Sequence, residues 1–314
     1  MSETTISCII PAFNCEHWLQ RAVASLLATN YSSLELLIVE DGSVDTTLEV
    51  ATQLQAEYPG VVKVFRHPLG ENRGVSASRN LGFEKSNGEW LCLLDADDYV
   101  YPNRFHSSAQ ILSTRPDVDG VHQLAEMVFS TTSAQEQWFE NENLFGFEDP
   151  VDPSKLLERL LEGRCWATSA IVFRRSLLER TGRFKEDLRI AEDCHLWFRM
   201  AALGNLVSGD LSKPVSAYWR HASSAYQPQH ENRLQFVRVL TAFFSWCKDR
   251  PVPPDMCRRV EKSVQRYIEN AIVQLREQHR PDLALRIIRH CGWHFFPVFL
   301  RSTVYRHLYH LMRG

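Results

Sequence analysis

Residues 34–43 read LELLIVEDGS, a mostly apolar run that leads directly into an acidic turn. A run without regular polar alternation is typical of a strand that is buried on both faces of a parallel sheet. Similar runs occur at residues 6–10, 61–65 and 90–94, and a helical pattern separates the first two. A second helix is expected after Asp45 as its N-cap. This βαβα order predicts an α/β fold with a mainly parallel sheet flanked by helices.

The chain of 314 residues is long enough for one such domain and a smaller appendage. Short strands are expected at residues 118–129 and 170–173, within a continuation of the same domain. From about residue 226 the pattern becomes almost continuously helical, and apolar residues between 256 and 275 trace one face of a long helix. We therefore expect an α/β domain over residues 1–225 and a C-terminal helical region over residues 226–314.

The composition excludes several classes of protein. A net charge of −3 argues against a surface that generally binds nucleic acid. Eight cysteines without a C-x-x-C pair favour free thiols in a reducing cytosol over a zinc site or a disulfide framework. No basic leader precedes the first strand, and no apolar run approaches the roughly 18 residues of a membrane-spanning helix. We expect a cytoplasmic protein, at most attached peripherally to the inner face of the membrane.

The C-terminal tail is the best candidate for such attachment. Residues 283–314 carry five arginines and no acidic residue, interleaved with tryptophan, phenylalanine and tyrosine. A basic and aromatic helical segment of this kind favours peripheral contact with a membrane or a partner. A helical cap with a solvated basic face is the alternative.

Polar motifs follow the predicted strands at the point where each strand ends. Asn14 follows the first strand, residues 40–43 follow the second, and residues 95–98, which read DADD, follow the fourth. Ligands of parallel α/β sheets bind outside the carboxyl ends of the strands, because loops and helix N-termini gather there. The motifs are therefore expected to share one mouth.

The DADD segment suggests a metal site. Three carboxylates within four residues raise one another's pKa, and a divalent cation such as Mn²⁺ or Mg²⁺ relieves that repulsion while binding substrate phosphates. A solvated acidic turn is the alternative. In the other acidic turn, Asp41 is suited to accept the imide N–H of a base such as uracil, and Gly42 allows a close backbone approach. For Asp41-Gly42 the alternative is an ordinary tight turn.

In order and spacing these motifs resemble the family-2 glycosyltransferases, which have the nucleotide-sugar-binding fold called GT-A. Residues 9–14, IIPAFN, resemble the opening strand and nucleotide loop, with Phe13 in place of the usual tyrosine. Residues 39–45, VEDGSVD, resemble D-D-G-S-x-D, with Glu40 in place of the first aspartate. Residues 74–82, GVSASRNLG, resemble G-x-x-x-A-R-N-x-G, and residues 93–98, LLDADD, end in L-D-x-D-D. The resemblance covers roughly residues 6–222.

This resemblance implies a role for each matching position. The nucleotide-sugar donor, most commonly a UDP-sugar, would contact Pro11, Ala12, Phe13, Asn14, Asp41, Gly42, Ser43, Arg79, Asp95 and Ala96. Mn²⁺ or Mg²⁺ would bind Asp97 and Asp95. His221 lies in RHASS, which is similar to the family's R-x-H-x-x-S-x-S ending, and would close over the metal or diphosphate. Independently of the family, a guanidinium matches phosphate oxygens, although Arg79 in a helix-surface salt bridge is the alternative.

The general base is implied by a later segment. Residues 184–197, FKEDLRIAEDCHLW, resemble F-x-E-x-x-x-x-x-E-D-x-x-L-W, in which the aspartate that starts the helix deprotonates the acceptor hydroxyl. Asp193 is the corresponding residue here, with Glu192 in support, and this pairing implies an inverting transfer. Acidic residues are also favoured at a helix N-terminus by its dipole without any catalytic role.

Two other functions compete with sugar transfer. A nucleotidyltransferase normally needs a glycine- and lysine-rich phosphate loop near the first strand, and residues 11–20 contain neither residue type. A catalytically weak module that only binds nucleotide-sugar is the second alternative. Trp166, Trp197 and Trp219 are each suited to stack on a sugar ring, although such residues more often lie in the core. The acceptor has no signature in the sequence, whether it is a glycan, a lipid-linked sugar or a protein.

Overall fold

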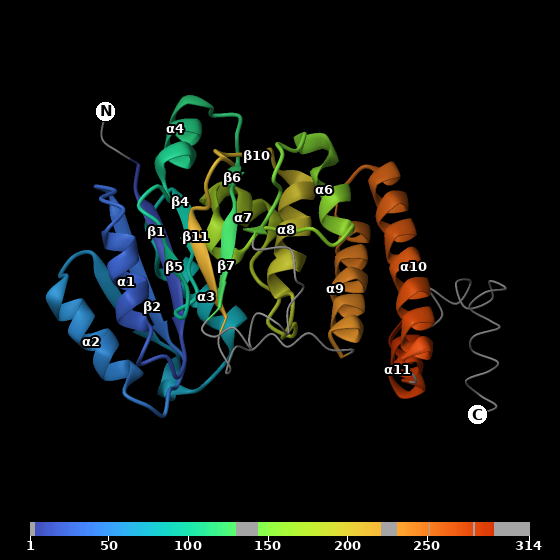
Figure 1. Ribbon diagram of the computed structural model, residues 1–314, viewed down its shortest axis with the longest axis horizontal. Coiled ribbons are helices and arrows are strands. Elements are labelled where there is room, and N and C mark those ends of the chain that lie inside the picture. Colours follow the sequence, from blue (N-terminus) through green and yellow to red (C-terminus); the bar gives the residue numbers. More distant parts are fainter. Residues whose placement is uncertain (1–3, 130–143, 221–230, 251, 279, 292–314) are drawn as a thin grey trace. The chain divides into compact units, whose positions relative to one another are not determined.

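The computed structural model describes residues 4–129, 144–220, 231–250, 252–278 and 280–291 (Figure 1). The chain forms two compact units. The first comprises residues 1–186 and 199–224, and the second comprises residues 187–198 and 225–314. Every strand of the described residues belongs to the first unit, which is therefore the α/β part of the protein.

The main sheet of the first unit has seven strands in the order β10-β6-β9-β4-β1-β2-β3. The strands are β1 (Ile6–Ala12), β2 (Leu34–Glu40), β3 (Val62–Arg66), β4 (Trp90–Leu93), β6 (Gly120–His122), β9 (Ile171–Arg174) and β10 (Leu206–Ser208). The four predicted apolar runs form β1 to β4, and β1 pairs in parallel with both β2 and β4. The predicted α/β fold with a mainly parallel sheet is confirmed. Strand β9 runs antiparallel to β4 and β6, which its apolar pattern did not indicate because such a pattern has no direction.

Helices of the first unit connect and cover these strands. They are α1 (Leu19–Leu27), α2 (Thr47–Glu57), α3 (Val75–Lys85), α4 (His106–Thr114), α6 (Pro153–Leu161) and α7 (Arg175–Thr181). The apolar residues of α1 that recur at helical spacing are buried, as predicted. Helix α2 has Thr46 at the N-cap position rather than Asp45, but Oδ1 of Asp45 accepts a hydrogen bond from the Thr47 N–H at 3.0 Å. Asp45 was predicted to occupy the N-cap position. It instead stands one residue before the N-cap and still accepts a hydrogen bond from the first turn of the helix.

Helix α3 packs unusually closely on β1. A Cβ atom at Gly82 would lie 2.3 Å from Cγ2 of Ile9, so this approach requires the absence of a side chain. The contact fixes the position of α3 along strand β1. Arg79, about one turn earlier in the same helix, is thereby placed near the carboxyl end of β1.

A second, four-stranded sheet has the order β5-β11-β7-β8. Its strands are β5 (Tyr99–Val100), β7 (Ala125–Phe129), β8 (Leu144–Phe145) and β11 (Ser216–Arg220). The predicted strand at residues 118–129 is wrong as a single element, because β6 pairs in the main sheet and β7 pairs in this one. Strand β5 begins immediately after the DADD segment and pairs antiparallel with β11. The small sheet is thus joined directly to the acidic turn.

The second unit is helical in the residues described. It contains α9 (Glu231–Lys248), α10 (Pro254–Glu277), α11 (Pro281–Cys291) and the first part of α8 (Glu192–Leu203). Val260, Val264, Ile268, Ala271 and Leu275 of α10 are buried, so the predicted long amphipathic helix is confirmed. The centre of the Tyr267 ring in α10 lies 5.0 Å from the centre of the Phe236 ring in α9.

Among the described residues, no helix combines the length and the apolar character needed to cross a lipid bilayer. Most of the predicted basic and aromatic tail falls in residues 292–314, which lie outside the described residues. Contact of this tail with a membrane or a partner stays a prediction.

Candidate functional site

The motifs that follow β1, β2 and β4 lie at one edge of the main sheet. Ala12 is in register with Glu40, and Ile9 is in register with Leu93. The Asp41 N–H donates to the carbonyl oxygen of Ala12 at 2.9 Å. Three adjacent parallel strands therefore end together, and their polar turns emerge side by side.

The loop after β1 is bonded to the loop after β2. The Asn14 N–H donates to Oγ of Ser43 at 3.0 Å, and Oδ1 of Asn14 accepts from the Val44 N–H at 3.0 Å. Asn14 adopts the left-handed conformation with φ 48°, which asparagine tolerates better than most residues. Phe13, immediately before it, keeps 49% of its surface exposed. An exposed aromatic face on a fixed loop is suited to stack on a nucleotide base.

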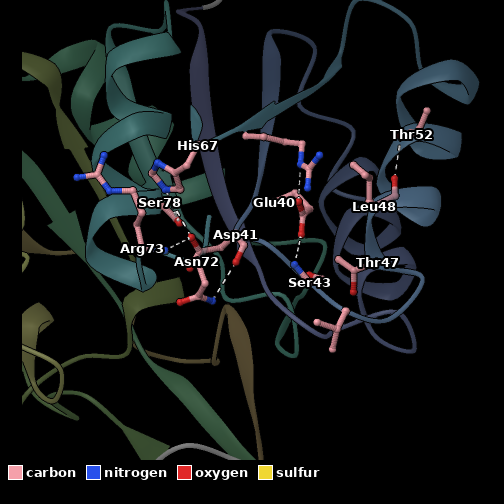
Figure 2. A network of polar contacts seen from close by, with 12 residues as sticks. Glu40, Asp41, Ser43, Thr47, Leu48, Thr52, His67, Asn72, Arg73 and Ser78 are labelled. Carbon is pink, nitrogen blue, oxygen red and sulfur yellow. Dashed lines mark hydrogen bonds and ion pairs between the residues drawn. The ribbon is translucent and has the colours of Figure 1, made fainter. Parts of the chain in front are cut away.

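Asp41 is buried and holds the segment that precedes α3 (Figure 2). Its Oδ1 accepts from the Arg73 N–H and its Oδ2 from the Gly74 N–H, both at 2.8 Å. Nδ2 of Asn72 donates to its carbonyl oxygen at 2.9 Å. A carboxylate has about four acceptor positions, so two N–H groups leave capacity for a base imide. Asp41 thus has a structural role that the sequence did not reveal, and its contact with a base stays a prediction.

The backbone at Gly42 packs closely against the backbone of residues 70–72, and this contact requires glycine. Its φ is +73°, and a Cβ there would lie 2.7 Å from the Gly70 carbonyl oxygen and 2.8 Å from the Asn72 nitrogen. A side chain would therefore be strained by its backbone conformation and would also collide with backbone. The loops after β2 and β3 are packed together at this point.

Glu40, which replaces the aspartate of the family pattern, is bound to the protein's own groups (Figure 2). Its carboxylate is fully buried and accepts hydrogen bonds from the Ser43 N–H and, at 2.7 Å, from Nε of Arg66. Burial acts to raise the pKa of Glu40, but the bonds from Ser43 and Arg66 outweigh it and hold the pKa below its ordinary value. Glu40 therefore fixes the turn that carries Asp41 and Gly42.

Arg79 connects α3 to the acidic turn after β4. Its Nη2 lies 2.7 Å from Oδ1 of Asp95, and its Cζ lies 5.0 Å from the centre of the Phe184 ring. The side chain is 3% exposed, so Arg79 does form a salt bridge, but a buried one rather than one on the helix surface, and its contact with a diphosphate stays a prediction. The Asp95 side chain is 27% exposed and so remains accessible on one side.

The remaining carboxylates of the turn differ in their surroundings. Asp97 is partly exposed, whereas Asp98 is buried and its Oδ1 accepts from the Trp219 N–H at 2.8 Å. Burial raises the pKa of Asp98 well above its ordinary value, and the neighbouring charges of Asp97 and Asp95 raise it further. The turn therefore places three carboxyl groups close together at the sheet edge.

These residues fit a divalent cation that arrives with a diphosphate. Within the described parts of the chain, no three histidine, cysteine or acidic side chains form a complete metal cage. Asp95 and Asp97 offer two partly exposed carboxylates, and Mg²⁺ and Mn²⁺ sites with few protein ligands take the others from water and substrate phosphates. His221, the third predicted metal ligand, lies outside the described residues.

Glu192 and Asp193 form the first turn of α8 and belong to the second unit. Glu192 is buried, and Asp193 is partly exposed with its Oδ1 accepting from the Cys194 N–H at 2.7 Å. Their position at a helix start is as expected from the sequence. Their part in catalysis stays a prediction.

Two contacts that hold the acidic turn were not indicated by the sequence, although Trp219 was considered there as a ring that could stack on a sugar. Arg21 in α1 donates from Nη2 to the Asp97 carbonyl oxygen at 2.6 Å, and Trp219 supplies the N–H bonded to Asp98. No local pattern identifies either contact, because the partners are 76 and 121 residues apart. Trp166 and Trp197 are fully buried, which agrees with their alternative reading as core residues.

Comparison with known proteins places the chain in a family. The profile of Glycosyl transferase family 2 matches residues 7–181. An uncharacterized glycosyltransferase of Nostoc sp., alr2836, is 32% identical over 180 residues, which are 56% of this chain and 52% of the relative. The uncharacterized glycosyltransferase YibD of Escherichia coli K12 is 31% identical over 137 residues, 44% of this chain and 38% of the relative. The chain thus spans about half or less of the length of these relatives.

Solved structures with low sequence identity share the fold. S. aureus TarS residues 1–349 in complex with UDP-GlcNAc superposes with a TM-score of 0.70 at 15% identity, covering 98% of this chain and 90% of that one. The mannosyltransferase PcManGT of Pyrobaculum calidifontis, in complex with GDP-Man and Mn²⁺, gives 0.56 at 17% identity, covering 99% and 87%. These likenesses confirm the predicted GT-A type of fold. Because the family profile covers more than half of the chain and includes the motifs at residues 9–14, 39–45, 74–82 and 93–98, the protein belongs to glycosyl transferase family 2.

Proposed function

We propose that the protein is an inverting, metal-dependent glycosyltransferase that moves a sugar from a nucleotide-diphospho-sugar to a hydroxyl group of an acceptor. The observation that carries the proposal is the shared sheet edge, where Phe13, Asp41, Arg79 and the acidic turn at residues 95–98 emerge from adjacent strands and the helix packed on them. An aromatic face, a base acceptor, a guanidinium and an acidic pair are the groups that a nucleotide-diphosphate requires.

A UDP-sugar is the first choice of donor. In the proposed complex the base stacks on Phe13 and its imide N–H donates to Asp41, while Gly42 and Ser43 line the same loop. A uracil imide has one N–H donor, which matches the acceptor capacity left on a carboxylate that already receives two amides. The structural likeness to a UDP-GlcNAc complex and a GDP-Man complex supports a nucleotide-sugar donor in general.

Asp95 and Asp97 would hold Mn²⁺ or Mg²⁺ against the donor diphosphate. The cation would neutralise the charge that develops on the departing nucleotide. Arg79 holds Asp95 in place and adds a fixed positive charge at the same edge. Oriented charges of this kind stabilise a leaving group because they need no rearrangement during the reaction.

Asp193 would act as the general base, with Glu192 in support. As the acceptor oxygen forms its bond to the anomeric carbon, the bond from that carbon to the phosphate oxygen breaks and the acceptor proton passes to Asp193. Attack from the face opposite the departing nucleotide inverts the configuration. The acceptor is to be sought among glycans, lipid-linked sugars and proteins.

A thermal-shift screen of UDP-, GDP- and dTDP-sugars with Mn²⁺ and with EDTA tests donor binding. A ligand that binds only the folded state raises the melting temperature, so we expect a rise for one nucleotide class that EDTA removes. Donor turnover is then followed in the wild type and in Asp193→Asn, which we expect to bind the donor normally but to transfer sugar at least about 100-fold more slowly. Binding without turnover on any acceptor would instead support a binding module.

A further inference from the structure

The acidic turn at residues 95–98 is fixed by two groups from distant parts of the first unit. Nη2 of Arg21, in α1, donates to the Asp97 carbonyl oxygen at 2.6 Å. The Trp219 N–H, in β11, donates to Oδ1 of Asp98 at 2.8 Å. The turn is therefore held by both its backbone and one of its side chains, and Asp95 and Asp97 are left partly exposed.

The two holding groups are themselves joined. Cζ of Arg21 lies 4.7 Å from the centre of the Trp219 ring and 4.9 Å from that of Tyr99. A guanidinium between two aromatic faces is fixed by cation–π attraction and by its planar shape. Among the described residues Arg21 forms no ion pair and its buried Nε has no hydrogen-bond partner. The guanidinium is thus directed at the acidic turn rather than used in an ordinary surface salt bridge.

Helix α1 contacts both the acidic turn and strand β5, which follows it. Oγ of Ser25, four residues after Arg21 and so on the same helix face, accepts from the Val100 N–H at 3.1 Å. Leu19, Ala22, Val23 and Leu26 are buried and fix the helix against the core. Because α1 begins soon after the loop of Phe13 and Asn14, it ties that loop to the acidic turn.

We propose that Arg21 and Trp219 form a clamp that positions Asp95 and Asp97 for the divalent cation. The inference rests on the proposed function, since it assumes that these carboxylates bind the metal of the donor complex. Neighbouring carboxylates repel one another, and a cation site needs its ligands at fixed separations. The clamp holds the backbone of the turn against this repulsion. Arg21 and Trp219 are positioning residues, because they act through the turn and not on the substrate.

Two substitutions in the full-length protein remove the clamp in different ways. Arg21→Met keeps the aliphatic length of the side chain but removes the guanidinium, and Trp219→Leu removes the indole face but keeps the N–H bonded to Asp98. Trp219→Phe retains a flat ring and is the conservative variant. Arg174→Met is the matched control, because Arg174 also donates to backbone carbonyls, those of Leu112 and Val118, but does so near the start of β4.

Calorimetric titration of each protein with Mn²⁺ at saturating UDP measures metal affinity. Thermal unfolding without metal measures stability. We expect Arg21→Met and Trp219→Leu to bind Mn²⁺ about 10-fold or more weakly, as is usual when groups that orient metal ligands are removed. Trp219→Phe should recover most of this loss. Arg174→Met should lower the melting temperature but leave Mn²⁺ affinity within about twofold of the wild type.

Equal Mn²⁺ affinity in Arg21→Met and Arg174→Met would overturn the clamp. If Arg21→Met does not fold, the comparison passes to Trp219→Leu and to Arg21→Lys, which keeps a charge but loses the stacked plane. A wild type that binds UDP with no dependence on Mn²⁺ would overturn the proposed metal site and the clamp together. The wild-type titration therefore separates failure of the proposed function from failure of this inference.

Discussion

The two ends of the main sheet hold buried carboxylates in opposite environments. Near the start of β2, the Glu35 carboxylate accepts from Oγ of Ser7 at 2.5 Å, from Nζ of Lys63 at 2.6 Å and from the N–H and Nδ2 of Asn87 at 2.9 Å. Burial acts to raise the pKa of Glu35, but these bonds outweigh it and lower the pKa from 4.5 to about 2. At the other end of the sheet, Asp98 is buried beside Asp95 and Asp97, and its pKa is raised.

The difference lies in the groups that surround each carboxylate. Donors surround Glu35, so its negative charge is satisfied within the protein and contributes to stability. At the opposite edge, the neighbouring carboxylates of Asp97 and Asp95 raise the pKa of Asp98, so three carboxyl groups lie close together even though Arg79 pairs with Asp95. Proteins keep such unfavourable arrangements mainly at functional sites. The comparison therefore supports a cation and its phosphate ligand at the carboxyl edge alone.

The strongest way to break this comparison is to remove a carboxylate from the acidic turn. We expect Asp97→Ala to reduce Mn²⁺-dependent donor turnover about 1,000-fold, because it removes a proposed metal ligand. The melting temperature without metal should stay level or rise, since a carboxylate that disfavours the charged form of its neighbour Asp98 is gone. Steady-state kinetics and thermal unfolding measure the two effects. A large fall in stability with unchanged turnover would assign the turn a structural role instead.

The converse change at the amino end should affect stability and not chemistry. Glu35→Gln keeps the size of the side chain but removes the charge that Lys63, Ser7 and Asn87 face. We expect the free energy of unfolding to fall by about 2–3 kcal/mol. This is less than the full pKa shift of Glu35 would give, because Lys63 is 40% exposed and solvent weakens its attraction to the carboxylate. Urea unfolding at neutral pH measures it, with Mn²⁺ affinity for the UDP complex as the control. Weakened metal binding in this variant would contradict the separation of the two ends.

The pH dependence of stability sharpens the comparison further. Glu35 has a lower pKa in the folded chain than in the unfolded chain, so its stabilisation is present above about pH 4.5 and is lost as the pH falls towards about 2. Between pH 5 and 3 the wild type should therefore lose about 1–2 kcal/mol more unfolding free energy than Glu35→Gln. Urea unfolding of both proteins across this range gives the difference. If the unfolding free energies of the two proteins change equally with pH, the hydrogen bonds do not lower the pKa of Glu35.

The sequence identified the strands and the site motifs because both depend on local patterns. The apolar runs of β1 to β4 and the buried face of α10 are periodic, and their burial follows directly from that periodicity. Asp41, Asp95 and Asp97 could be placed at strand ends for the same reason, since each follows its strand immediately. The antiparallel direction of β9 and the division of residues 118–129 between two sheets could not be read, because apolar runs encode neither direction nor partner.

By itself, then, the sequence determined the segments that form β1 to β4 and the polar groups that follow three of these strands. Tertiary structure alone decided how those groups are held. Arg21 reaches Asp97 across 76 residues, and Trp219 reaches Asp98 across 121. Local propensity sets the type of each element, whereas contacts between distant residues depend on how the elements pack. For this reason an acidic turn that is recognisable in the chain gains a fixed arrangement only when α1 and β11 close around it.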